Sequence, residues 1–212
     1  LVSKSSRSPL VHIWLASKMF ERSTQHSVCI LIATYNSSRF LSEQLDSIVK
    51  QNYCINKIII SDDGSTDSTP AVVRAFIDAH CELHVSFNTN SSGEKGPLAN
   101  FAHLCLLAMR HQADYYFFCD HDDIWIEDKV SKSVERLKHL EREKSGQTPI
   151  LIHTGLEVMD ETMQRSSGSL SKYQGLPSAN LQPLSMLLHQ NVVTGCSVGF
   201  NYALLEFATP VP

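Results

Sequence analysis

From Val28 onward, short apolar runs alternate with stretches in which apolar residues recur every three or four positions. Continuous runs of β-branched and aromatic residues are typical of strands buried on both faces. They predict strands over residues 28–34, 57–61, 83–87, 115–120, 150–155 and 192–200. The helical spacing predicts helices over residues 41–49, 69–77, 98–109, 130–140 and 202–208. Because strand and helix alternate up to residue 140, we expect an α/β fold with a mainly parallel sheet flanked by helices.

Composition adds limits on the class of protein. The chain has 212 residues, enough to bury a core as one domain. A formal net charge of −4 argues against nucleic acid as a partner, and no apolar run approaches the roughly 20 residues needed to span a bilayer. The six cysteines are widely spread, form no CxxC pair and mostly lie in apolar runs. We therefore predict buried thiols in a reducing compartment rather than a disulfide framework.

The first part of the chain does not share the regular pattern. It starts at Leu1, its first methionine is Met19, and residues 1–25 are rich in Ser and Arg. The short apolar patch there contains a His and lacks a small-residue cleavage site, so it is a poor signal peptide. We predict that residues 1–26 form a disordered or non-native leader and that residues 27–212 form the domain.

Polar clusters follow three of the predicted strands. They are ATYN at residues 33–36, DDGSTD at residues 62–67 and DHDD at residues 120–123. In open α/β sheets, ligands bind beyond the carboxyl ends of the strands. One such cluster is compatible with an ordinary turn, but three at the same edge of a sheet indicate a site.

The DDGSTD cluster, taken alone, allows two interpretations. It can be a strand-to-helix turn, with Gly64 for the backbone and Ser or Asp side chains as caps. Its carboxylates can also accept hydrogen bonds from a ligand. The loop at residues 88–97, with Lys95 and two glycines, is either a surface loop or a cover for a phosphate-bearing ligand.

The DHDD cluster favours a metal. Crowded carboxylates raise one another's pKa unless a positive group lies among them. The alternative is a solvated acidic turn that caps the next helix. Since the run before Asp120 is apolar, we expect the carboxylates at a buried strand end, where Mg²⁺ or Mn²⁺ is the best partner. The oxygen donors around His121 make that residue a weaker candidate ligand.

Three enzyme classes are disfavoured. Residues 195–199 fit the G-x-S-x-G pattern of serine hydrolases, but no His or Asp follows Ser197. A His-Asp phosphohydrolase site usually lies on helices, whereas residues 115–119 are strand-like. A dinucleotide-binding dehydrogenase needs glycines after its first strand, and ATYNSSRF contains none.

The stretches VCILIATYNSSRFLSEQLDSI, IIISDDGSTDST, YYFFCDHDDIWIEDKV and NVVTGCSVGFNYALL, in this order, resemble the family 2 glycosyltransferases with the Rossmann-like GT-A fold. They are similar above all to the rhamnosyltransferase-like subgroup of O-antigen and capsule assembly. The resemblance covers residues 27–212. It implies metal-dependent, inverting transfer of a sugar, such as rhamnose, from a nucleotide-diphosphate donor to a glycan or lipid-linked acceptor.

The resemblance also implies site residues. Ala33, Tyr35 and Asp63 would contact the base and ribose, and Asp120, Asp122 and Asp123 form the DxD region. The predicted nucleotide-sugar site comprises Ala33, Thr34, Tyr35, Asn36, Asp62, Asp63, Lys95, Asn100, Asp120 and Asp122. The predicted ligands of Mg²⁺ or Mn²⁺ are Asp122 and Asp123. The implied location is cytoplasmic, with peripheral contact at the inner face of the plasma membrane.

The chain departs from the subgroup in three places. His121 replaces a Gln of its metal motif, and Gly155 stands where the fifth strand often ends in an Asp. The catalytic base of the family is a carboxylate expected beyond Pro212, so we expect the C-terminal part of the fold to be missing. The alternative function is therefore a catalytically silent domain that binds nucleotide sugar.

Overall fold

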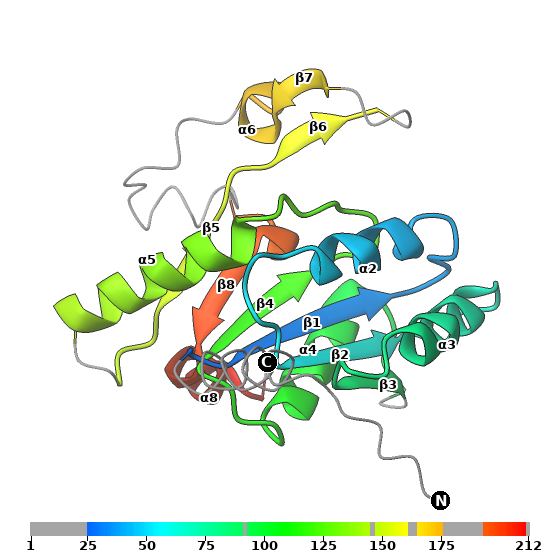
Figure 1. Cartoon of the computed structure of the whole chain (residues 1–212), viewed down its shortest axis with the longest axis horizontal. Helices are drawn as coiled ribbons and strands as arrows, with labels where there is room; N and C mark the ends of the chain where they lie inside the picture. The colour runs from blue at the N-terminus through cyan, green and yellow to red at the C-terminus, as the bar shows by residue number, and fades with distance from the viewer. Residues whose placement is uncertain (1–24, 91–92, 145–146, 161–164, 176–192, 211–212) are drawn as a thin grey trace, which may run out of the picture.

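The computed structural model describes residues 25–90, 93–144, 147–160, 165–175 and 193–210. Within them, a six-stranded sheet has the order β3-β2-β1-β4-β8-β5 (Figure 1). Its strands are β1 (Val28–Thr34), β2 (Lys57–Asp62), β3 (Val85–Thr89), β4 (Tyr115–Cys119), β5 (Leu151–His153) and β8 (Val198–Asn201). Strands β1 to β4 are parallel, whereas β8 is antiparallel to both β4 and β5. The predicted α/β fold with a mainly parallel sheet is confirmed.

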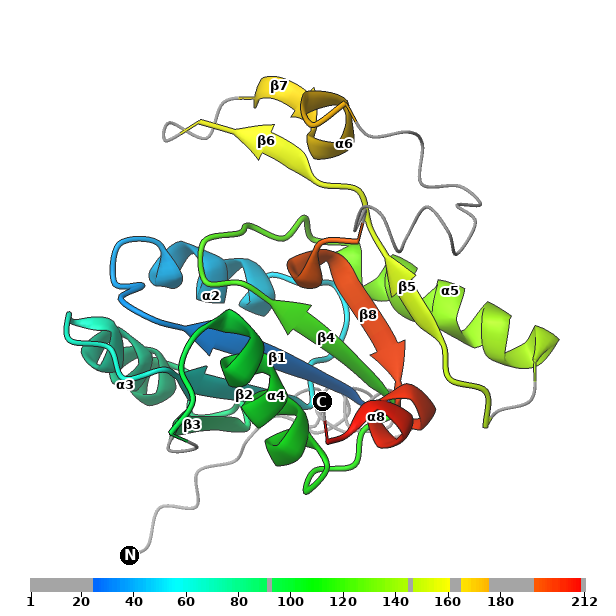
Figure 2. The same cartoon turned by 180° about the vertical axis from the view of Figure 1, so that it is seen from behind.

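Helices cover both faces of this sheet (Figures 1 and 2). One face packs against α2 (Leu41–Val49), α3 (Thr69–Ala79) and α5 (Lys129–Glu143), and the other against α4 (Pro97–Ala108) and α8 (Tyr202–Ala208). Side chains alternate between the faces of a strand, so Ile30 and Ile32 of β1 join the first core and Cys29 and Leu31 the second. All seven residues of β1 are buried, which explains its continuous apolar run.

A small β-hairpin lies outside the sheet and the helices that cover it. It pairs β6 (Glu157–Met159) with β7 (Arg165–Ser169), followed by the short helix α6 (Leu170–Tyr173), and both views place it beyond the β5 side of the sheet. None of the strands and helices predicted from the sequence lies within residues 165–173, a Ser- and Gly-rich stretch. The structure differs there, since β6 pairs with β7 and the Ser169 hydroxyl caps α6 by accepting from Lys172 N. Residues 176–183 lie outside the described part, as does nearly all of the predicted leader.

The sixth predicted strand is shorter than expected. Instead of a strand from residue 192, the turn η1 (Gly195–Ser197) precedes β8. The carbonyl of Thr194 accepts hydrogen bonds from the backbone N and the hydroxyl of Ser197, at 3.0 and 2.6 Å. These bonds close a turn and take residues 195–197 out of the sheet.

All six cysteines are free thiols, so no disulfide framework exists. The prediction of burial is right for four of them: Cys29, Cys105, Cys119 and Cys196. It is wrong for Cys54, which is partly exposed, and for Cys81, which is exposed. Both of these lie in the segments that join helices to strands rather than in the strands themselves.

Replacing Gly199 by Ala is expected to destabilise the fold. A Cβ at this position of β8 would lie 2.6 Å from Cε1 of Phe117, a ring that is 1% exposed and packs edge-on against Trp125. Overpacking of this kind costs about 1–3 kcal/mol of unfolding free energy. Urea denaturation measures it, with Gly155→Ala as the control, because a Cβ at Gly155 meets nothing within 4 Å. Equal stability of the two variants would contradict the packing of Phe117 against β8.

Candidate functional site

The carboxyl ends of β1, β2 and β4 lie next to one another in the sheet. The register pairs Thr34 with Asp62 across β1 and β2, and Ile32 with Cys119 across β1 and β4. The three polar clusters of the sequence therefore meet at one edge, as expected. In a parallel sheet this edge is the usual place for a ligand.

Asp62 is 3% exposed and organises the turn that follows β2. Its carboxylate accepts hydrogen bonds from the hydroxyls of Thr34 and Ser65 and from the backbone N of Gly64 and Ser65. These four bonds use the acceptor positions of a carboxylate. Thr34 is 1% exposed. The geometry thus favours a positioning role for Asp62 and Thr34 rather than direct contact with a ligand.

Asn36 joins the loop after β1 to the loop after β2. Its backbone N donates to the Ser65 hydroxyl at 2.9 Å, and its side-chain oxygen accepts from Thr66 N at 2.9 Å. Asn36 has a φ of 48°, a left-handed conformation that Asn tolerates better than most residues. The neighbouring Tyr35 is 55% exposed, so its ring is available to a ligand at this edge.

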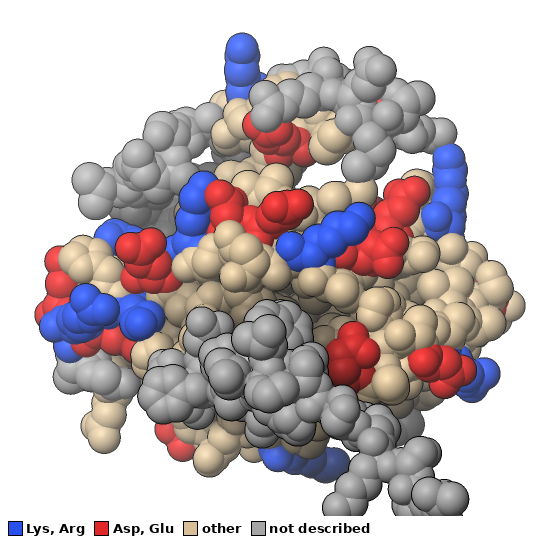
Figure 3. All heavy atoms as spheres, viewed as in Figure 1, with Lys and Arg blue, Asp and Glu red and all other residues tan. Residues whose placement is uncertain are grey.

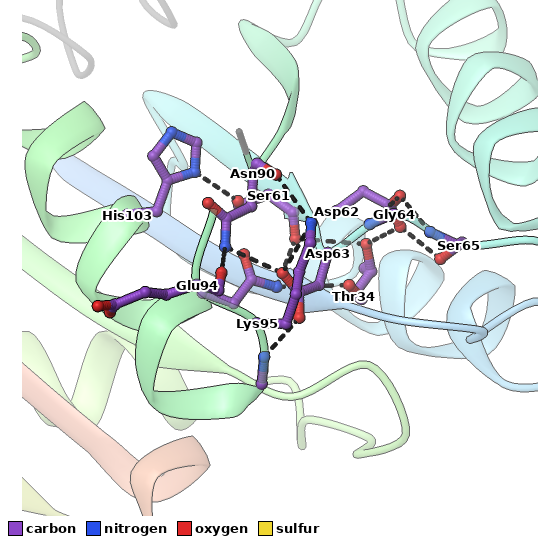
Figure 4. A network of polar contacts seen from close by, with 12 residues as sticks. Thr34, Ser61, Asp62, Asp63, Gly64, Ser65, Asn90, Glu94, Lys95 and His103 are labelled. Atoms are coloured by element: carbon purple, nitrogen blue, oxygen red, sulfur yellow. Dashed lines mark hydrogen bonds and ion pairs between the residues drawn. The ribbon is translucent and has the colours of Figure 1, made fainter. Parts of the chain in front are cut away.

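Asp63 is held by the loop before α4 (Figure 4). Its carboxylate accepts from Gly96 N at 2.7 Å and from Asn90 Nδ2 at 2.9 Å, and Lys95 Nζ lies 3.6 Å away. Asp63 is 7% exposed and Lys95 is 54% exposed. The predicted cover loop therefore does contact the predicted nucleotide-binding carboxylate, through a buried charge-assisted network.

Asn100 of α4 lies beneath this network. Its Nδ2 donates to the carbonyls of Ser61 at 3.0 Å and Thr34 at 3.4 Å, which ties the ends of β1 and β2 to α4. Asn100 is 3% exposed, and its Oδ1 is buried without a partner among the described residues. This residue holds the strand ends together from inside the protein.

The acidic cluster after β4 gathers around a cysteine. Ligand atoms of Asp120, Asp123 and Cys196 all lie within 4.8 Å of one another. The Cys196 thiol, in η1, lies beside both carboxylates. Burial raises the pKa of Asp120, and the charges of Asp123 and Asp122 raise it further. Burial likewise raises the pKa of Asp123, while the neighbouring Cys196 thiol opposes that shift.

Lys129 places a positive charge beside this cluster. Lys129, the first residue of α5, is 8% exposed, stacks over the Trp125 ring at 4.8 Å and donates to Thr154 Oγ1 at 3.2 Å. Burial lowers its pKa, and nearby Cys119, Cys196 and Asp123 oppose that shift. A single lysine does not balance three carboxylates. The Oδ2 atom of Asp123 is buried and lacks a partner among the described residues, so the cluster fits a divalent cation.

The structure brings together most of the predicted residues, but in different roles. Asp120 and Asp123 converge on a common point. Asp122 is exposed and lies outside that cluster, and the partly buried His121 also lies outside it. Sequence reasoning missed three contributors: Asn90, Lys129 and Cys196. In the stretch GCSVG, the sequence suggested only Ser197, as a possible hydrolase nucleophile. In the structure, the neighbouring Cys196 lies beside the carboxylates.

A groove of about 900 Å³ opens beside the acidic cluster. Its lining includes Asp122, Asp123 and Cys196, residues 124–126, the start of α5, Phe40 and Glu43 near α2, and most of residues 152–160. Figure 3 shows acidic and basic side chains interspersed on the visible face, without a large area of one sign. No helix in the described residues is long and apolar enough to cross a membrane.

Comparison with known proteins decides the family. The sequence model described as Glycosyl transferase family 2 matches residues 29–175. The chain belongs to this family. The matched range includes all three polar clusters of the strand edge.

Two relatives and one solved structure illustrate the family. The chain is 35% identical to dTDP-rhamnosyl transferase RfbG of Shigella flexneri over 107 residues, which are 50% of this chain and 36% of the relative. It is 26% identical to UDP-Glc:alpha-D-GlcNAc-diphosphoundecaprenol beta-1,3-glucosyltransferase WfgD of Escherichia coli over 111 residues, which are 52% of this chain and 40% of the relative. These matches span less than half the length of either relative.

Among solved structures, residues 1–349 of S. aureus TarS superpose with a TM-score of 0.56 at 17% identity. This likeness covers 85% of the present chain and 48% of the other. At that identity it establishes a shared fold, which agrees with the GT-A architecture expected from the sequence.

Proposed function

We propose that this family 2 domain transfers a sugar, rhamnose being the first candidate, from a nucleotide-diphosphate donor to a glycan or lipid-linked acceptor. The observation that carries the proposal is the position of Asp63 after β2 and of Asp120 and Asp123 after β4, at the carboxyl ends of two parallel strands that flank β1. The name of the Shigella relative favours dTDP-rhamnose as the donor to test first.

The donor fits this edge in two parts. Asp63 and the exposed ring of Tyr35 would bind the nucleoside, with the backbone of Ala33 beside them. Lys95 is near enough to Asp63 to interact with a phosphate at the same place. Asp120 and Asp123, whose carboxylates converge, would hold Mg²⁺ or Mn²⁺. When bound, the cation supplies Lewis-acid stabilisation of the leaving diphosphate.

The acceptor would occupy the groove beside the acidic cluster. Ile124 and Ile126 are 41% and 69% exposed there, and the lining also carries basic and acidic side chains, Lys132 being paired with Asp128. Exposed apolar groups beside polar groups suit an acceptor that combines a lipid with a glycan. Direct displacement with inversion also needs a base for the acceptor hydroxyl. We assign none among the described residues.

Calorimetric titration of the chain with UDP and dTDP, each with and without Mn²⁺, tests the donor site. We expect metal-dependent binding, with dTDP preferred over UDP if rhamnose is the sugar. Circular dichroism on the same sample shows that it is folded. Absence of binding by either nucleotide to a folded sample would contradict the donor site, and binding of UDP alone would contradict rhamnose. Binding without transfer to any acceptor would favour the catalytically silent alternative.

Location and further partners stay predictions from the resemblance. A cytoplasmic site of action at the inner face of the plasma membrane fits a lipid-linked acceptor. The net charge of −4 gives no support to nucleic acid as a partner.

A further inference from the structure

We infer that Cys196 is a direct ligand of the cation, so that the metal centre combines two carboxylates with a thiolate. This inference rests on the proposed metal-dependent donor site and goes beyond its expected all-oxygen ligands. It assigns a function to a residue in a stretch that otherwise has none.

The geometry places the sulfur where a ligand belongs. One ligand atom from each of Asp120, Asp123 and Cys196 lies within 4.8 Å of the others. Three donors that each lie about 2.0–2.3 Å from a common cation are separated by distances of this order or shorter. A small inward movement of the side chains would therefore complete the set around one ion.

The backbone around Cys196 is fixed. The turn η1 is closed by the bonds from Ser197 to the Thr194 carbonyl, and Thr154 N donates to the Ser197 carbonyl at 3.1 Å. Cys196 is 4% exposed, and β8 follows directly and pairs with both β4 and β5. The sulfur is thus presented to the end of β4 by a rigid support, which is what a ligand needs.

A second observation points to a missing partner at the same place. The Oδ2 atom of Asp123 is buried and accepts no hydrogen bond from the described residues. Buried polar atoms without a partner are rare and call for an unseen ion or water. The thiol proton can serve only one acceptor at a time, whereas a cation would satisfy both carboxylates and the sulfur together.

The chemistry predicts a change in metal preference. A thiol binds a metal as the thiolate, so binding breaks the S–H bond, forms a sulfur–metal bond and releases one proton to solvent. Oxygen-only sites suit Mg²⁺ and Mn²⁺, whereas a thiolate favours softer ions such as Zn²⁺ and Co²⁺. We therefore expect Co²⁺ and Zn²⁺ to bind more tightly than Mg²⁺ and to compete with Mn²⁺.

Absorption spectroscopy with Co²⁺ tests the sulfur–metal bond directly. The protein used carries Cys54→Ser and Cys81→Ser, which remove the two more accessible thiols. We expect a thiolate-to-cobalt charge-transfer band in the near ultraviolet. The band should disappear in Cys196→Ser, with at least about a tenfold loss of Co²⁺ affinity. It should persist in Cys105→Ser, a matched control whose buried thiol has no charged neighbour that shifts its pKa.

X-ray absorption of the Zn²⁺-loaded protein without further mutation gives an independent answer. One sulfur at about 2.3 Å from zinc is expected. Oxygen and nitrogen neighbours alone, or a charge-transfer band that survives Cys196→Ser in a folded variant, would overturn the inference. Failure of this test with intact Mn²⁺-dependent nucleotide binding would leave the donor site standing. A sulfur–metal bond without nucleotide binding would instead leave the thiolate site standing and remove the donor function.

Discussion

Asp123→Asn is expected to abolish the Mn²⁺-dependent part of nucleotide binding while the domain stays folded. Asp123 contributes a buried oxygen without a partner to the only His, Cys, Asp and Glu cluster of metal-ligand geometry found in the described residues. Loss of an outer-shell partner already lowers metal affinity about 10–100-fold, so loss of a direct ligand should cost at least about 100-fold. Calorimetric titration with dTDP and Mn²⁺ measures the effect.

The same substitution is expected to raise the melting temperature of the metal-free protein near neutral pH. Because the pKa of Asp123 is raised by burial, the folded state holds its proton more tightly than the unfolded chain does. Tighter proton binding stabilises the folded state. This stabilisation is fully present below the ordinary pKa of an aspartate and is lost as the pH rises through the raised pKa of Asp123. Asn carries no charge, so the variant avoids that loss. Thermal unfolding in EDTA at pH 4 and pH 7 checks the sign.

Two further variants sharpen the test. Asp78→Asn changes an exposed carboxylate on α3 and should alter neither the metal dependence nor the pH dependence. Asp122→Asn is the second comparison, since Asp122 is exposed in this structure and outside the convergent cluster. If Asp122→Asn alone abolished Mn²⁺-dependent binding and Asp123→Asn did not, the cation would lie on the solvent side of the loop. The assignment of Asp123 would then be wrong.

The parallel half of the fold was predictable because each strand is buried on both faces. Such burial requires continuous apolar runs, as in β1, and the runs are separated by helices of clear amphipathic spacing. Strand order and direction near the other edge were not predictable in the same way. The antiparallel pairing of β8 between β4 and β5 depends on contacts between residues far apart in the chain, such as Phe117 with Gly199 and Ile152 with Gly199. No local pattern encodes such a contact.

The site was partly predictable for a related reason. Polar residues at the ends of apolar strands are visible in the sequence, which is why Asp63, Asp120 and Asp123 were selected. The partners that reach the site from distant segments were not visible. Cys196 arrives through a turn that interrupts an expected strand, and Lys129 is buried against Trp125 although lysine is almost always exposed. The sequence also did not distinguish the roles of Asp62 and Asp63 within DDGSTD. Only their different hydrogen-bond partners in the structure do so.

Asp63→Ala is expected to weaken binding of the nucleoside portion about 10–100-fold, both with and without Mn²⁺. A hydrogen bond to a charged group contributes about 1.5–3 kcal/mol, and 1.4 kcal/mol corresponds to a tenfold change in affinity. Titration with uridine and thymidine isolates this part of the ligand, since neither carries a phosphate that could recruit the cation. Asp63→Ala and Asp123→Asn should therefore affect separable parts of the binding energy.

The control must separate ligand contact from support of the loop. Asp63 accepts bonds from Gly96 N and Asn90 Nδ2, so its removal leaves buried donors unpaired and should also lower the unfolding free energy by about 1–3 kcal/mol. Lys95→Ala removes a half-exposed ion pair with a 3.6 Å separation and the bond from Lys95 Nζ to the Asn90 carbonyl, but it keeps both hydrogen bonds to Asp63. Such pairs contribute about 0–1 kcal/mol, so nucleoside binding should persist in this variant. If Asp63→Ala lost stability in urea but kept full nucleoside affinity, Asp63 would serve the loop alone, and the base would have to bind elsewhere on the strand edge.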